Sequence, residues 1–176
     1  MTDPLDQAGK PRRAGDPGAR PEGDCELARA VAMCAADAGF LDELKQILSQ
    51  ADRAATRRHF DCRQCGRCCR FEQFGHRLYV TAGELALMLH PAPDQASAMS
   101  PAAGLCPHQG QDRCLARAGR ALGCRLFFCD PSAHEWFCDA YESFHQQIKL
   151  LHAAHGLPYV YAELTAALAE LASRGG

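Results

Sequence analysis

Apolar residues recur every three or four positions over most of the chain after a polar start. Residues 1–23 are rich in glycine and proline with almost nothing apolar, which predicts a disordered tail. Beyond it, Leu27 and Cys34 fall on one face of a first helix. Gly39 is expected to interrupt the pattern, and a second amphipathic helix is predicted over residues 40–58.

The middle of the chain combines a short strand with a capped helix. Residues 77–80 predict the strand. Thr81 and Glu84 have the spacing of a capping box, which opens a helix that Pro91 ends. Residues 92–104 lack periodicity and predict a spacer over the domain surface.

The C-terminal part predicts two more helices. Asp130 is placed to cap a long helix with Pro131 in its first turn, and its apolar stripe continues to His155. Gly156 closes it, and a last helix is predicted over residues 159–173. The predicted class is mainly α: a small helical domain with an irregular cysteine-rich metal-binding loop region and at most a short β-hairpin.

Length favours one domain with a real core, because the chain has 176 residues. We divide it into a tail (1–23), N-terminal helices (24–58), a cysteine-cluster metal-binding domain (59–158) and a C-terminal helix packed on that domain (159–176).

Charge and compartment limit the function classes. The net charge of −2 gives no strong nucleic-acid signal. The chain shows no signal peptide and no apolar run near the roughly 18 residues of a membrane span, so we expect a cytoplasmic protein with no membrane partner. Thiols stay reduced there, so the 11 cysteines are better interpreted as metal ligands than as disulfides. The protein partner and oligomeric state are undetermined.

Four cysteines lie within eight residues, in a segment that we call the knuckle: Cys62, Cys65, Cys68 and Cys69. Two successive C-x2-C spacings let sulfurs grip a metal or cluster from one tight turn. Gly66 can take the left-handed backbone conformation that such a turn needs. Cys68 and Cys69 are adjacent, so we do not expect both to join the first two around one tetrahedral centre.

A second cysteine-rich stretch supplies further candidate ligands: Cys106, Cys114, Cys124 and Cys129. Its spacings are looser than those of the knuckle. Metal sites commonly join two distant half-sites, so we expect the two stretches to converge on shared inorganic ions.

Arginines and histidines close to these cysteines in the sequence have several possible roles. Thiolate sites are anionic, and five arginines can offset that charge or form a solvated face: Arg63, Arg67, Arg70, Arg120 and Arg125. An anionic substrate pocket is a third possibility for them. Whether histidines such as His59, His76 and His108 are ligands is left open by the sequence, and Cys25, Cys34 and Cys138 are expected to pack as small hydrophobes.

These motifs together resemble a known family. The knuckle, followed by Cys106, Cys114, Arg120, Cys124-Arg125-x-Phe127 and His155-Gly156-Leu157-Pro158, is similar to the CxxCxxCC cysteine-cluster or YkgJ family over about residues 60–158. The resemblance implies a bacterial cytosolic protein that chelates zinc or iron. One branch of the family resembles flagellin lysine methylases, which implies an iron–sulfur centre. Ala121 stands where the family usually has proline after the arginine.

The metal and the activity stay open at this point. Cys62, Cys65 and Cys68 reproduce the C-x2-C-x2-C run of ferredoxins, which favours an iron–sulfur cluster, while a C-x2-C half-site also suits Zn²⁺. The leading hypothesis is a metal-binding protein with a structural or electron-carrying centre. The alternatives are a cluster-dependent protein-modifying enzyme and a metal-trafficking protein, so whether it is an enzyme is uncertain.

Overall fold

The protein is described by a computed structural model. The described residues are 23–60, 66–75, 77–89, 105–106, 108–110, 113–114 and 119–173. Within them the fold is mainly α, as the sequence predicts. The predictions for the tail before residue 23 and for the spacer over 92–104 lie outside the described residues.

The first two helices are separated at Asp37. Helix α1 spans Gly23–Ala36 and α2 spans Ala38–Thr56. The Asp37 carboxylate accepts a hydrogen bond from the Phe40 backbone N–H at 2.9 Å, which caps α2. The prediction of an interruption at Gly39 is wrong, because this cap starts the helix earlier and Gly39 lies inside its first turn.

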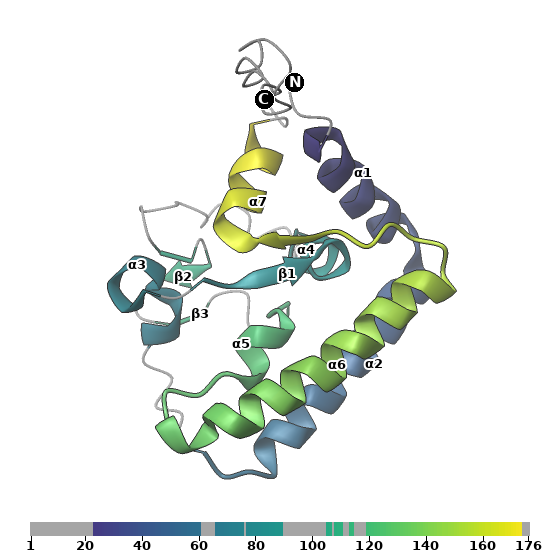
Figure 1. The fold of residues 1–176 in the computed structure, drawn as a ribbon. Coiled ribbons are helices and arrows are strands. Elements are labelled where there is room, and N and C mark those ends of the chain that lie inside the picture. The colour runs from purple at the N-terminus through teal and green to yellow at the C-terminus, as the bar shows by residue number, and fades with distance from the viewer. Residues whose placement is uncertain are drawn as a thin grey trace, which may run out of the picture.

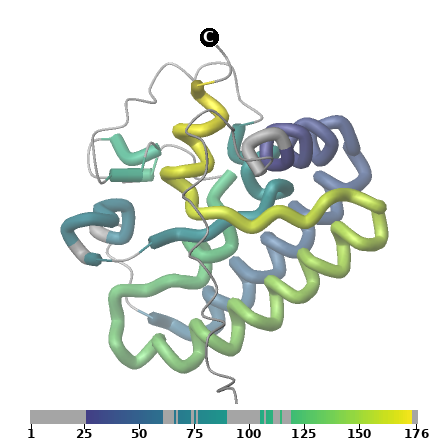
Figure 2. The backbone as a smooth tube through the Cα atoms, turned by 45° about the horizontal axis from the view of Figure 1, so that its top comes forward, coloured from purple at the N-terminus to yellow at the C-terminus, as the bar shows by residue number. Residues whose placement is uncertain are grey.

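Two long helices lie side by side along one edge of the fold in Figure 1. Helix α6, His134–Ala154, lies beside α2 in both views (Figures 1 and 2). A short 3₁₀ turn, Pro131–Ala133, precedes α6, and the Asp130 carboxylate accepts from the Ser132 N–H at 2.9 Å. Asp130 therefore caps this 3₁₀ turn, and the prediction that the long helix itself begins at Pro131 is wrong, because α6 begins three residues later, after Ala133.

The capping box is formed as predicted. Strand β1 spans Tyr79–Thr81 and runs directly into α4, Ala82–Leu89. The Thr81 hydroxyl accepts from the Glu84 N–H at 3.2 Å, and the Glu84 carboxylate accepts from the Thr81 N–H at 2.8 Å.

The last predicted helix begins later than expected. Residues Tyr161–Glu163 form β4, which pairs antiparallel with β1, with Val80 opposite Ala162. Helix α7 spans only Leu164–Ala172. The prediction of helix from residue 159 is wrong because Glu163 caps α7 from outside, with its side chain accepting from two backbone N–H groups of the first turn.

A second pair of strands is a small hairpin, β2 at Gln109–Gly110 and β3 at Arg113–Cys114. Helix α5, Leu122–Leu126, lies between α2, α6 and β1. Buried side chains from α1, α2, α4, α5, α6 and α7 form one cluster, so the predicted N-terminal helices, cysteine-rich part and C-terminal helix share a core. None of the described helices is long and apolar enough to cross a membrane.

Candidate metal centre

The described half of the knuckle is a tight turn. Gly66 has φ of 67°, the left-handed conformation that the sequence predicts for it. The turn continues into a 3₁₀ segment, Arg67–Cys69, in which the Cys69 N–H donates to the Gly66 carbonyl at 3.0 Å. Cys68 is exposed and Cys69 is buried. Cys62 and Cys65 lie outside the described residues.

The second cysteine-rich stretch lies directly against this turn. The Cys106 N–H donates to the Cys69 carbonyl at 2.7 Å. The Gln109 side chain donates to the Gly66 carbonyl at 3.4 Å, and its backbone N–H closes a turn on the Cys106 carbonyl at 2.9 Å. The two stretches that the sequence separates are therefore in backbone contact.

Two further segments bring thiols to the same place. In the hairpin, Cys114 is paired with Gln109, and Cys124 is carried by α5. Together with the two contacting stretches they give five thiols that line one cavity of about 780 Å³: Cys68, Cys69, Cys106, Cys114 and Cys124. These five are the predicted ligands that the structure brings together.

Three other described cysteines are not among the residues that line this cavity. Cys129 lines a separate hollow beside His134, at the start of α6. Cys138 is one turn further along α6, with its sulfur 4.0 Å from His134 Nε2. Cys34 is fully buried in the core, where burial and then Asp37 raise its pKa to about 11. Cys34 thus packs as a small hydrophobe, as expected, whereas the same expectation for Cys138 is wrong, because Cys138 is exposed on α6; the side chain of Cys25 lies outside the described part of the structure.

The clustered thiols strongly affect one another's ionisation. A hydrogen bond with Cys106, followed by burial, raises the pKa of Cys69 to about 12. The pKa of Cys68 is raised first by its hydrogen bond to Cys69, and that of Cys124 first by burial and then by the charges of Cys69, Cys114 and Cys68. Several thiolates cannot accumulate here without a compensating positive charge.

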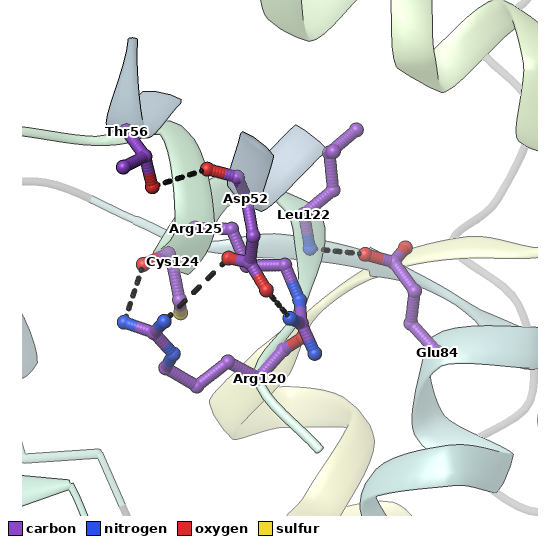
Figure 3. Close-up of polar contacts among 7 residues, drawn as sticks. All are labelled: Asp52, Thr56, Glu84, Arg120, Leu122, Cys124 and Arg125. Carbon is purple, nitrogen blue, oxygen red and sulfur yellow. Dashed lines mark hydrogen bonds and ion pairs between the residues drawn. The ribbon is translucent and has the colours of Figure 1, made fainter. Parts of the chain in front are cut away.

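Part of that charge comes from an arginine pair on one carboxylate. Arg125 Nη1 donates to Asp52 on α2, and Arg120 Nη2 lies 3.7 Å from the other carboxylate oxygen (Figure 3). Arg125 Nε also donates to the Arg120 carbonyl at 2.7 Å. Two guanidinium groups share one carboxylate, and the surplus positive charge of Arg120 offsets a small part of the rise in the pKa values of Cys68 and Cys124.

The other three predicted arginines are not among the residues that line the cavity or lie outside the described structure. Arg70 Nη1 donates to the Gln73 side chain at 3.4 Å. The side chains of Arg63 and Arg67 lie outside the described part of the chain. Only Arg120 and Arg125 of the predicted set therefore line the cavity in the structure as described.

A buried carboxylate fixes the helix that carries Cys124. Glu84 Oε1 accepts from the Leu122 N–H, the first of α5, at 2.7 Å (Figure 3). The other carboxylate oxygen, Oε2, accepts from Thr81 in the capping box. Glu84 is 2% exposed. The sequence identifies Glu84 as a capping residue, but it gives no sign of this second bond, nor of the role of Asp52.

The histidines around the cavity differ in exposure. His108 is buried, which lowers its pKa, and its Nε2 has no hydrogen-bond partner in the described structure. His59 lines the same cavity but is exposed, with φ of 56° at the end of α2. His76 lies outside the described residues.

No family model, curated protein or solved structure matches the chain. The described residues also contain no group of three Cys, His, Asp or Glu side chains already arranged to hold a metal ion. The donor set nevertheless fits zinc or an iron–sulfur cluster chemically, since five soft sulfur donors and a cationic neighbour suit those groups and not a hard cation such as Mg²⁺. Completing such a site requires the undescribed cysteines or a closer approach of the thiols.

Aromatic rings also line the cavity. They come from the turn after α2, the α5–α6 connection, α6 and β4: Phe60, Phe127, Phe128, Phe137, Tyr141 and Tyr161. Apolar lining of this kind lowers the local dielectric, which strengthens electrostatic interactions. The arrangement can hold an anionic, sulfur-rich inorganic group in a half-buried site with a cationic side chain beside it.

Proposed function

We propose that this chain is a metal-binding protein that holds zinc or an iron–sulfur cluster through its clustered cysteines, in a structural or electron-carrying role. The observation that supports it most is the meeting of five thiols from four chain segments at one cavity. Metal sites built from distant half-sites gather thiols from separate chain segments in this way.

The described ligands are Cys68, Cys69, Cys106, Cys114 and Cys124, and Cys62 and Cys65 complete the C-x2-C-x2-C run from outside the described residues. The resemblance of these motifs to the CxxCxxCC, or YkgJ, family agrees with this proposal. A bound zinc ion would supply a cross-link, and an iron–sulfur cluster would supply one-electron transfer. Cys129 is left outside this ligand set, because it lines a different hollow.

The charge around the cavity favours such an anionic group. Arg120 has a half-buried side chain, and its Nε is buried without a hydrogen-bond partner in the described structure. An N–H donor of this kind can bond to a metal-bound sulfur, and its charge favours the thiolate form. Asp52, which also lines the cavity, holds the Arg120 and Arg125 pair in place.

The test is anaerobic purification of the full chain, followed by counts of iron, zinc and acid-labile sulfide per chain and a visible spectrum. Wild-type protein is expected to carry metal. Cys124→Ser should lower the metal count, whereas Cys34→Ser, a matched change at a buried thiol in the core, should not. A folded wild-type protein that is colourless and metal-free would refute the proposal.

The size of the cavity favours a second candidate function, a cluster-dependent enzyme that modifies protein. About 780 Å³ is within the range of small-molecule pockets and exceeds what an ion alone requires. An iron–sulfur centre with one iron that lacks a protein ligand would support this function, because substrate chemistry needs an open position. Complete ligation by protein side chains would count against it. Fast exchange of the metal with a competing chelator would instead support metal trafficking.

A further inference from the structure

His108 is a buried polar side chain with an unsatisfied nitrogen. The residue is 7% exposed, and its Nε2 is buried without a hydrogen-bond partner in the described part of the chain. Buried ring nitrogens are normally paired with a protein group, a water or a metal. A nitrogen left unpaired beside a cavity therefore indicates a partner that binds there.

The cavity that His108 lines is the one lined by the clustered thiols. The turn that carries His108 is fixed at both ends: the Cys106 N–H is bonded to the Cys69 carbonyl at 2.7 Å, and the Gln109 N–H to the Cys106 carbonyl at 2.9 Å. These bonds hold the backbone of the turn that carries the imidazole against the thiol-bearing turn.

We propose that His108 is a nitrogen ligand of the metal centre, which then has mixed sulfur and imidazole ligation. This inference rests on the proposed function. Imidazole binds zinc alongside thiolates, and in some iron–sulfur centres histidine replaces cysteine on one iron. The sequence alone leaves this open, because Cys106-Pro107-His108 matches no ligand spacing by itself.

Two other histidines provide a comparison. His152 also has a buried, unpaired Nε2, but this atom is directed toward Gly83 inside the core, and its Nδ1 is bonded to the Pro158 carbonyl at 2.9 Å. His59 lines the thiol cavity but is exposed, so water can satisfy its ring. Only His108 of these three combines burial, an unpaired nitrogen and the thiol cavity, and His59 is the matched control.

The experiment is X-ray absorption at the edge of the metal found in the anaerobically purified full chain. Wild-type protein should show sulfur at roughly 2.3 Å and nitrogen at roughly 2.0 to 2.1 Å, with the outer-shell scattering of imidazole. That scattering should be lost in His108→Ala and kept in His59→Ala. His108→Cys should retain the metal with a sulfur-only shell.

The outcomes separate this inference from the proposed function. A sulfur-only shell in metal-loaded wild-type protein overturns the His108 ligand and leaves the metal-binding function standing, whereas a metal-free folded wild type overturns both. Imidazole scattering that persists in His108→Ala or in His108→Cys also overturns it. If folded His108→Ala loses the metal or its imidazole scattering while His108→Cys keeps the metal with a sulfur-only shell and His59→Ala keeps metal and imidazole, the inference is supported.

Discussion

Glu84 should be among the most costly single residues to truncate in this protein. Its carboxylate accepts three hydrogen bonds: from the Thr81 N–H and hydroxyl, both at 2.8 Å, and from the Leu122 N–H at 2.7 Å. All three residues are at most 2% exposed. Replacement by alanine leaves two backbone N–H groups buried without an acceptor, one in β1 and one at the start of α5.

The magnitude follows from those two orphaned donors. Each costs about 1–3 kcal/mol, or about 2–6 kcal/mol together. Removing the buried carboxylate relieves part of its desolvation penalty, so the expected net loss for Glu84→Ala is about 2–4 kcal/mol of unfolding free energy. Glu84→Gln keeps one acceptor oxygen and should lose roughly half as much.

Urea denaturation followed by circular dichroism measures the loss. Glu26→Ala, at an exposed position of α1, is the control and should stay within about 0.5 kcal/mol of wild type. The account of Glu84 would be wrong if Glu84→Ala also unfolded within that margin. Because Leu122 begins the helix that carries Cys124, folded Glu84→Ala protein should also bind less metal than the control.

Three further predictions concern other parts of the core and its rim. Gly83→Ala would place a Cβ 2.6 Å from the buried Phe40 ring, and thermal unfolding should show a loss of about 1–3 kcal/mol. Hydrogen bonding to Asp37 raises the pKa of His155. Urea unfolding should therefore show that His155→Gln loses most unfolding free energy below the ordinary histidine pKa of about 6.5. This loss relative to wild type should shrink as the pH rises through the raised pKa of His155. Toward acid, protonation of Asp37, whose pKa is lowered, removes the same contact. Cys34 should react with iodoacetamide at pH 8 far more slowly than the exposed Cys138 of α6, because burial raises the pKa of Cys34 to about 11. Equal alkylation rates of the two cysteines, measured by mass spectrometry, would contradict the burial of Cys34.

Local signals in the sequence predicted the elements whose stabilising contacts are also local. The capping box at Thr81 and Glu84, the Asp130 cap and the left-handed Gly66 each depend on contacts within a few residues, and each is found. Strand β4 was missed for the opposite reason. Its three residues are too few to show a period, and they are extended because they pair with β1, about 80 residues earlier in the chain.

The candidate site was predictable in its chemistry and not in its geometry. The spacing of the clustered cysteines indicates metal ligands. Because metal sites often join two distant half-sites, the sequence also predicted that the second cysteine-rich stretch approaches the first, as Cys106 approaches Cys69. Asp52 has no comparable signal, because one aspartate on an amphipathic helix is expected to be solvated. Its function depends on α5 packing against α2, a contact that only the folded chain reveals.

Helix α5 explains how a fold of this size can support such a site. Five residues long, it is held by Glu84 at its first N–H and by Asp52 through Arg125, so Cys124 is attached to the helical core at two independent points. The other clustered thiols belong to a 3₁₀ turn, a two-residue strand and the irregular segment at Cys106, which are short elements. A metal bound by Cys124 and these other thiols would join the short elements to α5. The free energy of metal binding would then stabilise the folded form of the short elements alone. The core around Phe40 and Ile148 does not depend on that energy, because it is already closed by apolar packing.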